Sequence, residues 1–364
     1  MTNIDSQAFS YCNALTNVTI PDSFILNFKT IFPSYTNIKT VAFSSGTTSI
    51  RENACSGYNW IVNLTIPDSV TSIGANAFNN CQSLSSIAIP SGVTSIGESA
   101  FSGCTGLASV KITDLVSWCG IEFGNHTANP LNSLGKPNLV LNSVTVTDMI
   151  IPSDVTNIGN YAFHGYQKLT SVTITNGVQG IGDNAFETCS NLTSISIPGS
   201  VISIGDNAFR YCIKLATVTM GNGIETIGDN AFINCTKLGT ITIPNSVTEI
   251  GSGAFRDCGL SSITLSNNLS NITANLLENC DGLDEIIIPA SVTNINVSAF
   301  FGCTEISYVT MQSIEPPTIE GGVIFHSSTH LRTVYVPQAS VSKYFTALSG
   351  KLPNNNPTVT IVGY

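Results

Sequence analysis

Hydrophobic residues recur along most of the chain with a period of 23 residues. In the unit that begins at residue 181, they occupy Ile181, Ala185, Phe186, Cys189, Leu192, Ile195, Ile197 and Val201. Such units begin at Ile4, Asn27, Ile50, Ile73, Ile96, Ile158, Ile181, Ile204, Ile227, Ile250, Ile272 and Ile295. A register held over so many units predicts a repeat array, which grows by stacking rather than around one central core.

Each unit carries the signals of three short elements. Residues 193–197 alternate polar and apolar side chains, and this pattern predicts a strand that ends at Pro198. The residues that lead to Ile181 predict a second short extended piece, after which Gly182 permits a tight corner. Asp183 then stands where the N-cap of a single helical turn is expected.

A coil of this length is too short to bury its own apolar face. It must stack on the next coil at the spacing of paired strands, about 4.8 Å. About fourteen coils would then give a parallel sheet on the order of 65 Å long. The repeat therefore predicts an α/β repeat solenoid that is curved, with a parallel β-sheet, short strands and single helical turns in each coil.

One segment departs from the repeat, at about residues 119–157. It contains 39 residues where one coil would take 23, so we expect an insertion that emerges as a loop or hairpin. One interpretation is a protrusion that contacts a ligand, because repeat arrays often place insertions on one binding face. The other is a packed local elaboration, in which Trp118 and Phe123 cover nearby apolar surface.

The two ends of the chain differ. Val341, Tyr344, Phe345 and Leu348 fall on one face at helical spacing and predict a short helix that covers the last coil. We therefore expect the solenoid over residues 1–337 and a C-terminal cap over 338–364. The N-terminus shows no basic and apolar export signal, so we expect a truncated start, with any such signal upstream.

The composition excludes several classes of partner. Charged residues make up only 10% of the chain, and 13 basic residues against 23 acidic ones give a formal net charge of −10. Binding to nucleic acid or to anionic membrane surfaces needs clustered Lys and Arg, so neither is expected. Membrane insertion is not expected either, because no apolar run reaches the 18 or so residues of a membrane helix.

Cysteines follow the repeat. Nine of the eleven occupy one position of the unit, namely Cys12, Cys81, Cys104, Cys189, Cys212, Cys235, Cys258, Cys280 and Cys303. A zinc site would need paired Cys-x-x-Cys or His partners, which the sequence lacks. We expect buried thiols without disulfide bonds that act as small hydrophobes, and Cys55 and Cys119, outside this series, are expected to be unpaired too.

No motif predicts catalysis, a cofactor or a metal. The sequence contains no nucleophile elbow, P-loop or dinucleotide-binding glycine motif. His326 and His330 stand four residues apart, but Ser327 and Thr329 add no ligand strength, and a solvated loop is expected. Asp183, Asp206 and Asp229 would stack in successive coils, which leaves calcium binding as an alternative to helix capping. We expect capping and a chain that is not an enzyme.

The remaining candidate is a surface. Side chains between the buried pair of each strand point outward. The candidate partner-binding residues of this sheet face are Lys111, Thr173, Ser196, Thr219, Thr242, Thr264 and Thr310. This polar, weakly charged face either suits a large partner or consists of β-branched hydroxyl residues that only keep the sheet soluble.

The unit Leu-x-x-Ile-x-Ile-Pro, joined to Ile-Gly-x-x-Ala-Phe-x-x-Cys, resembles the 23-residue leucine-rich repeat of BspA-like surface proteins. Segments that begin at Asp114 and Ile314 resemble that family as found in Bacteroides-type gut bacteria. The resemblance implies a leucine-rich-repeat-like, right-handed curved superhelix. It also implies a secreted or cell-surface adhesin that binds proteins, with matrix proteins such as fibronectin and fibrinogen among the family's partners.

Two other functions remain open. A glycan-binding module would need exposed aromatic platforms, for which the sheet face offers Tyr308 and Tyr335. A structural spacer that displays another domain would need no binding face at all.

Overall fold

The computed structural model describes residues 9, 12, 14–21, 37–321, 324–325, 328–353 and 359–364. The repeats predicted to begin at Ile4 and Asn27 start outside these residues. His326 also lies outside them. The chain divides into two compact units. Unit 1 is Met1–Thr147 with Ile158–Lys168, and unit 2 is Asp148–Asn157 with Leu169–Tyr364. The predicted boundary between a solenoid and a cap at residues 337 and 338 stays a prediction.

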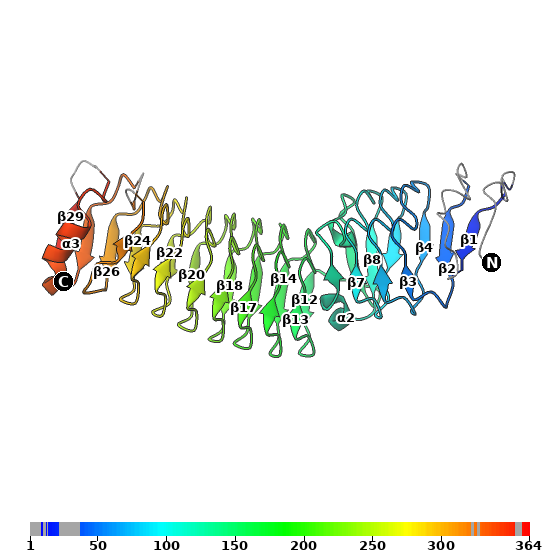
Figure 1. Cartoon of the computed structure of the whole chain (residues 1–364), viewed down its shortest axis with the longest axis horizontal. Helices are drawn as coiled ribbons and strands as arrows, with labels where there is room; N and C mark the ends of the chain where they lie inside the picture. The colour runs from blue at the N-terminus through cyan, green and yellow to red at the C-terminus, as the bar shows by residue number, and fades with distance from the viewer. Residues whose placement is uncertain are drawn as a thin grey trace. The chain divides into compact units, whose positions relative to one another are not determined.

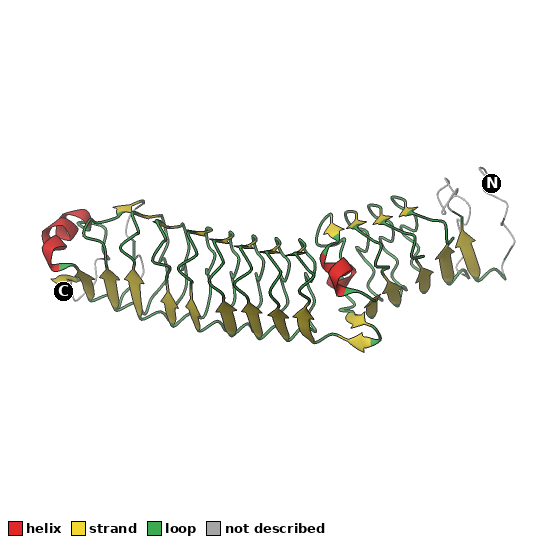
Figure 2. Cartoon of the chain, turned by 90° about the horizontal axis from the view of Figure 1, so that it is seen from below, coloured by secondary structure: helices red, strands yellow, loops and turns green. Residues whose placement is uncertain are grey.

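Unit 1 is a stack of coils with two rows of strands. The row of longer strands contains β1 (Asn17–Ile20), β2 (Thr40–Phe43), β4 (Asn63–Thr65), β6 (Ser86–Ala88), β8 (Ser109–Ile112) and β10 (Asn138–Leu141), side by side in that order (Figure 1). The row of two-residue strands contains β3 (Ser49–Ile50), β5 (Ser72–Ile73), β7 (Ser95–Ile96) and β9 (Glu122–Phe123). Figure 2 shows the two rows on opposite sides of the coils.

Unit 2 repeats this arrangement. Its longer strands are β12 (Asp148–Ile151), β14 (Ser171–Ile174), β16 (Ser194–Ile197), β18 (Thr217–Met220), β20 (Thr240–Thr242), β22 (Ser262–Thr264), β24 (Glu285–Ile288), β26 (Tyr308–Met311), β28 (Thr333–Val336) and β29 (Thr360–Gly363). Its short strands are β15 (Gly180–Ile181), β17 (Ser203–Ile204), β19 (Thr226–Ile227), β21 (Glu249–Ile250), β23 (Asn271–Ile272), β25 (Asn294–Ile295) and β27 (Thr318–Ile319). Strand β13 (Asn157–Ile158) spans the boundary between the units.

The sequence period sets the register of the parallel strands. Val172 pairs with Ile195, and Ile195 pairs with Val218, each 23 residues further along the chain. Residues of one repeat position therefore form rows across the coils. One such row is the stack of Phe186, Phe209, Phe232 and Phe255, whose ring centroids lie 5.3, 5.1 and 5.3 Å apart. These four rings are fully buried. The predicted parallel repeat solenoid is thus observed within each unit.

The predicted helical turn in each coil is wrong. The segment after Gly182 forms hydrogen-bonded turns, and Asn184 has a φ of 56°, which an α-helix cannot contain. Its backbone instead bonds to the next coil at every second residue. The N–H groups of Asn184, Phe186 and Thr188 donate to the carbonyl oxygens of Asp206, Ala208 and Arg210. These bonds join the coils in addition to the hydrogen bonds of the two rows of strands, and they take the place of hydrogen bonds within a helix.

Most of the insertion is packed structure. Helix α2 (Leu115–Cys119) leads into it, and the first turn of this helix is capped by the carboxylate of Asp114. Trp118 is buried, its indole N–H donates to the carbonyl of Ala162 at 2.9 Å, and its ring contacts Phe123 edge to face at 5.5 Å. The chain continues through η1 (Pro130–Asn132) to β10, which turns back into the antiparallel strand β11 (Val144–Thr145). Val144 of β11 is 67% exposed.

The end of the chain contains the predicted helix and an additional strand. Helix η2 (Gln338–Ser340) leads into α3 (Val341–Ala347), which buries Tyr344, and Leu348 at its C-cap is buried as well. The Tyr344 hydroxyl donates to the carbonyl of Ser313 at 2.9 Å. Phe345 was predicted on the same face but is 57% exposed, because only one side of this short helix contacts the coil. Strand β29 then returns to pair in parallel with β28.

Candidate binding surfaces

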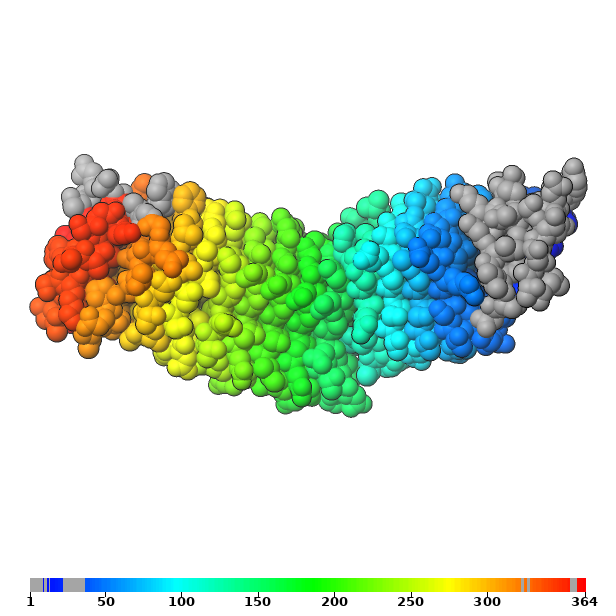
Figure 3. Space-filling model, in the orientation of Figure 1, coloured from blue at the N-terminus to red at the C-terminus, as the bar shows by residue number. Residues whose placement is uncertain are grey.

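The hydroxyl residues predicted on the sheet face form one outward row in unit 2. Thr173, Ser196, Thr219, Thr242 and Thr264 are all exposed, while the residues on either side of each in the strand are buried or nearly so. Thr173 and Ser196 are direct partners across β14 and β16, and Ser196 is in turn the partner of Thr219. Successive coils occupy successive bands of the unit 2 surface in Figure 3. This row is rigid, polar and without charge.

Thr310 differs from the other predicted hydroxyls because it is half-buried. Its direct partners across the sheet are Ile287 of β24 and Tyr335 of β28, both much larger than Thr. Their side chains cover part of it. The hydroxyl row therefore ends before β24, and the face of the last four strands has another chemistry.

Lys111 lies in unit 1, beside a hollow of about 650 Å³ on the face of the longer strands. Lys111 has Ala88 of β6 as one direct partner and Val140 of β10 as the other. The small Ala88 side chain leaves space next to the lysine, and Asp68 and the turn at Asn142 close the hollow. We did not predict Ala88 or Val140 as site residues, although their outward positions follow from the strand register.

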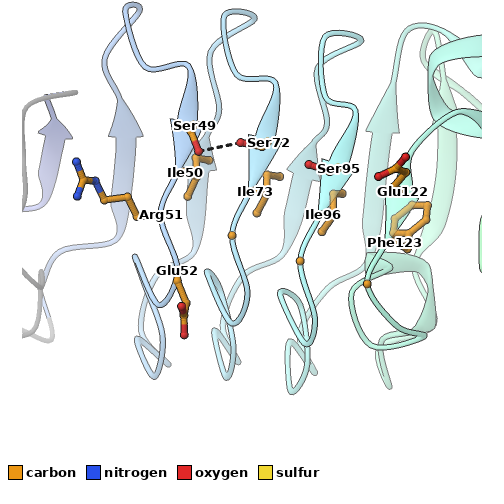
Figure 4. Close-up of a pocket in the computed structure, with 13 residues that line it drawn as sticks. Ser49, Ile50, Arg51, Glu52, Ser72, Ile73, Ser95, Ile96, Glu122 and Phe123 are labelled. Atoms are coloured by element: carbon orange, nitrogen blue, oxygen red, sulfur yellow. Dashed lines mark hydrogen bonds between the residues drawn. The ribbon is translucent and has the colours of Figure 1, made fainter.

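A groove runs along each row of two-residue strands, on the side opposite the predicted face. In unit 1 it has a volume of about 530 Å³, and in unit 2 about 820 Å³. Figure 4 shows the unit 1 groove, where the Ser72 hydroxyl donates to Ser49 at 2.8 Å. The side chains of Arg51 and Glu52 point away from each other, so no charged groups converge on a ligand there.

The aspartates of the unit 2 groove join one coil to the next. The Oδ1 atoms of Asp183, Asp206 and Asp229 accept hydrogen bonds of 2.8, 2.7 and 2.6 Å from the backbone N–H groups of Asp206, Asp229 and Ser252. The predicted capping role is therefore wrong, since no helix follows these residues. A Cβ on Gly205 would lie 2.5 Å from Oδ1 of Asp183, which explains the glycine at this position.

The cysteines also join coils. All eleven lie within the described residues and none forms a disulfide. Seven thiols donate to backbone carbonyl oxygens of the preceding coil, such as Cys235 to Phe209 at 3.4 Å and Cys303 to Leu277 at 3.0 Å. They are thus hydrogen-bond donors as well as the small hydrophobes that we predicted. Cys12 is exposed, contrary to the prediction that all are buried.

Burial makes these thiols poor nucleophiles. It raises the pKa of Cys55, Cys104 and Cys303 to about 12, because the thiolate would lose its hydration. Burial of Cys212 and Cys235, together with the neighbouring cysteines, raises their pKa values well above the usual range. These five thiols are therefore neutral at physiological pH.

The described residues contain no cluster of metal-ligating side chains and no helix of membrane-spanning length. In them, no three His, Cys, Asp or Glu side chains gather as a metal ion would require. The Nδ1 atom of His330 lies 3.0 Å from the carbonyl oxygen of Thr304 and 4.0 Å from the Glu305 carboxylate. None of the helices in the described part of the chain has the length and apolar character to cross a membrane.

Comparisons with known proteins match nearly the whole chain. A family model described as the BspA type leucine-rich repeat region, in six copies, matches residues 2–120, 137–258 and 225–347. A leucine-rich repeat protein from Bacteroides ovatus has 24% sequence identity, covers 89% of this chain and 92% of its own, and superposes with a TM-score of 0.59. No curated protein matches the chain.

Two further solved structures match with lower TM-scores. A leucine-rich cell surface protein from Faecalibacterium prausnitzii has 24% identity, a TM-score of 0.49 and 93% coverage of both chains. A leucine-rich repeat protein from Eubacterium ventriosum has 21% identity, a TM-score of 0.49, and coverage of 86% of this chain and 88% of its own. The Bacteroides ovatus structure, at a TM-score of 0.59, confirms the predicted repeat fold.

Proposed function

Because the chain belongs to the BspA-type leucine-rich repeat family, we propose that it is a non-enzymatic adhesin that binds other macromolecules outside the cell. Membership of this family suggests a protein-interaction scaffold, and its members are typically surface proteins. The adhesin role, the matrix proteins fibronectin and fibrinogen as first candidate partners, and the location at the cell surface or in the secreted fraction are parts of this proposal.

The observation that carries the proposal is the outward row of Thr173, Ser196, Thr219, Thr242 and Thr264. Hydrogen bonds hold β14, β16 and β18 in register and β20 with β22, and a stack of buried Phe rings lies within the coils. A face built this way loses little conformational entropy when a partner binds. Short hydroxyl side chains also leave the surface flat, which suits a large partner rather than a small molecule.

The face of unit 1 adds the only charge among the predicted outward residues, that of Lys111. A cation beside an apolar wall formed by Val140 and Ala88 suits an acidic or polar side chain of a partner. The hydroxyl row and the Lys111 hollow are therefore two separate contact regions, one in each unit.

The test is binding of the purified chain to an array of matrix proteins and glycans. The test variant carries Thr173→Glu, Thr219→Glu and Thr242→Glu, which place three negative charges on the hydroxyl row. The control variant carries Asn222→Glu, Thr236→Glu and Thr248→Glu, three exposed residues outside the longer strands, so the change of net charge is the same.

Saturable binding of one matrix protein, lost in the test variant and kept in the control, is the expected result. Binding that survives the test variant but is lost on Lys111→Glu would move the contact to unit 1. A chain that binds no protein on the array would contradict the adhesin proposal and favour a structural spacer.

A further inference from the structure

The outward face of the last four longer strands is apolar and aromatic, unlike the hydroxyl row before it. On β24, β26 and β29 the side chains of Ile287, Tyr308 and Val362 are 47%, 39% and 42% exposed. Tyr335 of β28 lies on the same face and is half-buried. We call Ile287, Tyr308, Tyr335 and Val362 the C-terminal patch. Large apolar side chains gathered on one exposed face mark an interaction site more often than scattered ones do.

The strand register brings the four residues together. Ile287, Thr310, Tyr335 and Val362 are successive direct partners across β24, β26, β28 and β29. Tyr308 lies one outward position earlier on β26, and its ring stacks on that of Tyr335 with centroids 6.2 Å apart and an interplanar angle of 26°. The half-buried Thr310 lies between Ile287 and Tyr335. The patch is thus a continuous group of aromatic and aliphatic side chains on one face.

Acidic groups lie beside the C-terminal patch. Asp284 and Glu285 are exposed at the start of β24, and Glu285 is the direct partner of Tyr308. The carbonyl oxygen of Asp284 accepts from the N–H of Ser307, which holds this acidic corner against β26. Glu305 is exposed just before β26 and lies 4.0 Å from Nδ1 of His330, and Arg332 is exposed just before β28. Three carboxylates against one guanidinium and one imidazole give this rim an excess of acidic groups.

The charge and the side chains of the patch favour one class of binding partner over others. A second copy of this chain, with a net charge of −10, would be repelled from an acidic rim. A saccharide could stack on the tyrosines, but Ile287 and Val362 offer it neither a π face nor a hydrogen bond. A protein uses all of these groups, since Tyr is enriched at the energetic centres of interfaces and a cation is attracted both to Tyr faces and to carboxylates.

We propose that the C-terminal patch anchors a protein partner by receiving an apolar side chain that is flanked by Lys or Arg. The inference rests on the proposed function, because it names where a protein partner is held and what chemistry that partner presents. It assigns the strongest contact to the end of the array rather than to the hydroxyl row.

The experiment uses a random dodecapeptide library displayed on phage and selected on the full chain. Selected peptides are then synthesised with a fluorescent label, and their dissociation constants are measured by anisotropy. The variants are Tyr308→Ala with Tyr335→Ala, Ile287→Ser alone, and Glu285→Gln. The control is Asn222→Ala with Thr248→Ala, which changes two exposed residues outside the longer strands.

We expect selected peptides to carry Leu, Phe or Trp within two residues of Lys or Arg. Removal of the two tyrosine rings should weaken binding about tenfold or more, as at an interface hot spot. Glu285→Gln should weaken it about two- to threefold and reduce its dependence on salt, and the control should bind as the wild type does. If the loss of the Tyr335 ring lowers the melting temperature, Ile287→Ser tests the patch independently of the tyrosines.

Three results would overturn the inference. These are peptides that bind the tyrosine variant as well as the wild type, selected peptides without a basic residue, and a glycan whose binding depends on the tyrosines. The proposed function fails separately. Matrix binding that is lost on the Thr-to-Glu changes but kept in the tyrosine variant supports the adhesin and refutes the patch. Peptide binding that depends on the patch, when no matrix protein binds to the chain, supports the patch and refutes the adhesin.

Discussion

Replacing Phe209 by Ala should remove one ring from the middle of the aromatic stack of unit 2. Phe209 is fully buried, and its ring lies 5.3 Å from that of Phe186 and 5.1 Å from that of Phe232, nearly parallel to both. Loss of a buried Phe side chain typically costs about 3–5 kcal/mol, because apolar surface is lost and a cavity remains. Two ring contacts are lost together, so we expect about 4 kcal/mol or more.

The assay must report on this coil, because a repeat array need not unfold in one cooperative step. Both tryptophans, Trp60 and Trp118, belong to unit 1, so tryptophan fluorescence would not report on the substituted coil. Amide hydrogen exchange does so directly. The N–H groups of Phe209 and Tyr211 donate to Ala231 and Ile233 at 2.7 and 2.9 Å, and their protection measures the opening of this coil.

A cost of about 4 kcal/mol corresponds to a loss of protection of about a thousandfold at these amides. The control is Thr219→Ala on the neighbouring strand, which is exposed and should change protection by less than about threefold. Equal losses of protection in the two variants would refute the assignment of inside and outside positions on which the fold description depends.

Two further predictions concern the rows that join the coils. In the native chain, Ellman's reagent should react quickly with one thiol, Cys12, and with all eleven after denaturation. A change from pH 7 to pH 10 should not increase the number of thiols that react quickly, because burial raises the pKa of Cys55 and Cys104 to about 12 and thiols are neutral below their pKa. Several quickly reacting thiols in the native chain would contradict the burial of the cysteines. Asp206→Ala leaves the N–H of Asp229 without its acceptor at 2.7 Å, so the melting temperature should fall by an amount that corresponds to about 0.5–1.5 kcal/mol of stability. Asp206→Asn keeps an oxygen acceptor and should retain most of the wild-type melting temperature.

The repeat period allowed much of the fold to be predicted. A spacing of 23 residues places Val172, Ile195 and Val218 in one buried row, and the structure pairs them in that order. Pattern analysis failed where a backbone shape depends on the neighbouring coil. Asn184 adopts a φ of 56°, and the N–H groups around it bond to the next coil, so a segment with the composition of a helical turn forms none. Single-chain propensity contains no information about such bonds.

The end of the chain could be predicted only in part, for a related reason. The helical spacing identified α3 and the buried Tyr344, but Phe345 is exposed because the helix has a single coil to contact. Strand β29 lacks the repeat signature and is held by its pairing with β28. A strand of this kind depends on the edge available to it, and that edge exists only after the preceding coils have stacked.

The candidate binding surfaces follow from what the repeat leaves unconstrained. Stacking uses the buried Ile, Phe, Leu and Cys positions and a corner glycine, and these recur in most coils, although Arg51, Thr273 and Asn296 replace the glycine in theirs. The outward position between the two buried residues of a strand touches only its neighbours on the same face, so any side chain is compatible with the fold there. It is Lys in β8 and Ile in β24, while β14 and β18 carry Thr.

Partner choice must therefore depend on departures from the commonest outward residue rather than on the repeat itself. A run of similar hydroxyls offers a partner many equivalent registers along the array. Specific recognition needs a position that differs from the others. In unit 2 the stacked pair of Tyr308 and Tyr335 beside an acidic rim provides such a position. We propose that the hydroxyl row serves as the extended contact and that the C-terminal patch fixes where on the array the partner binds.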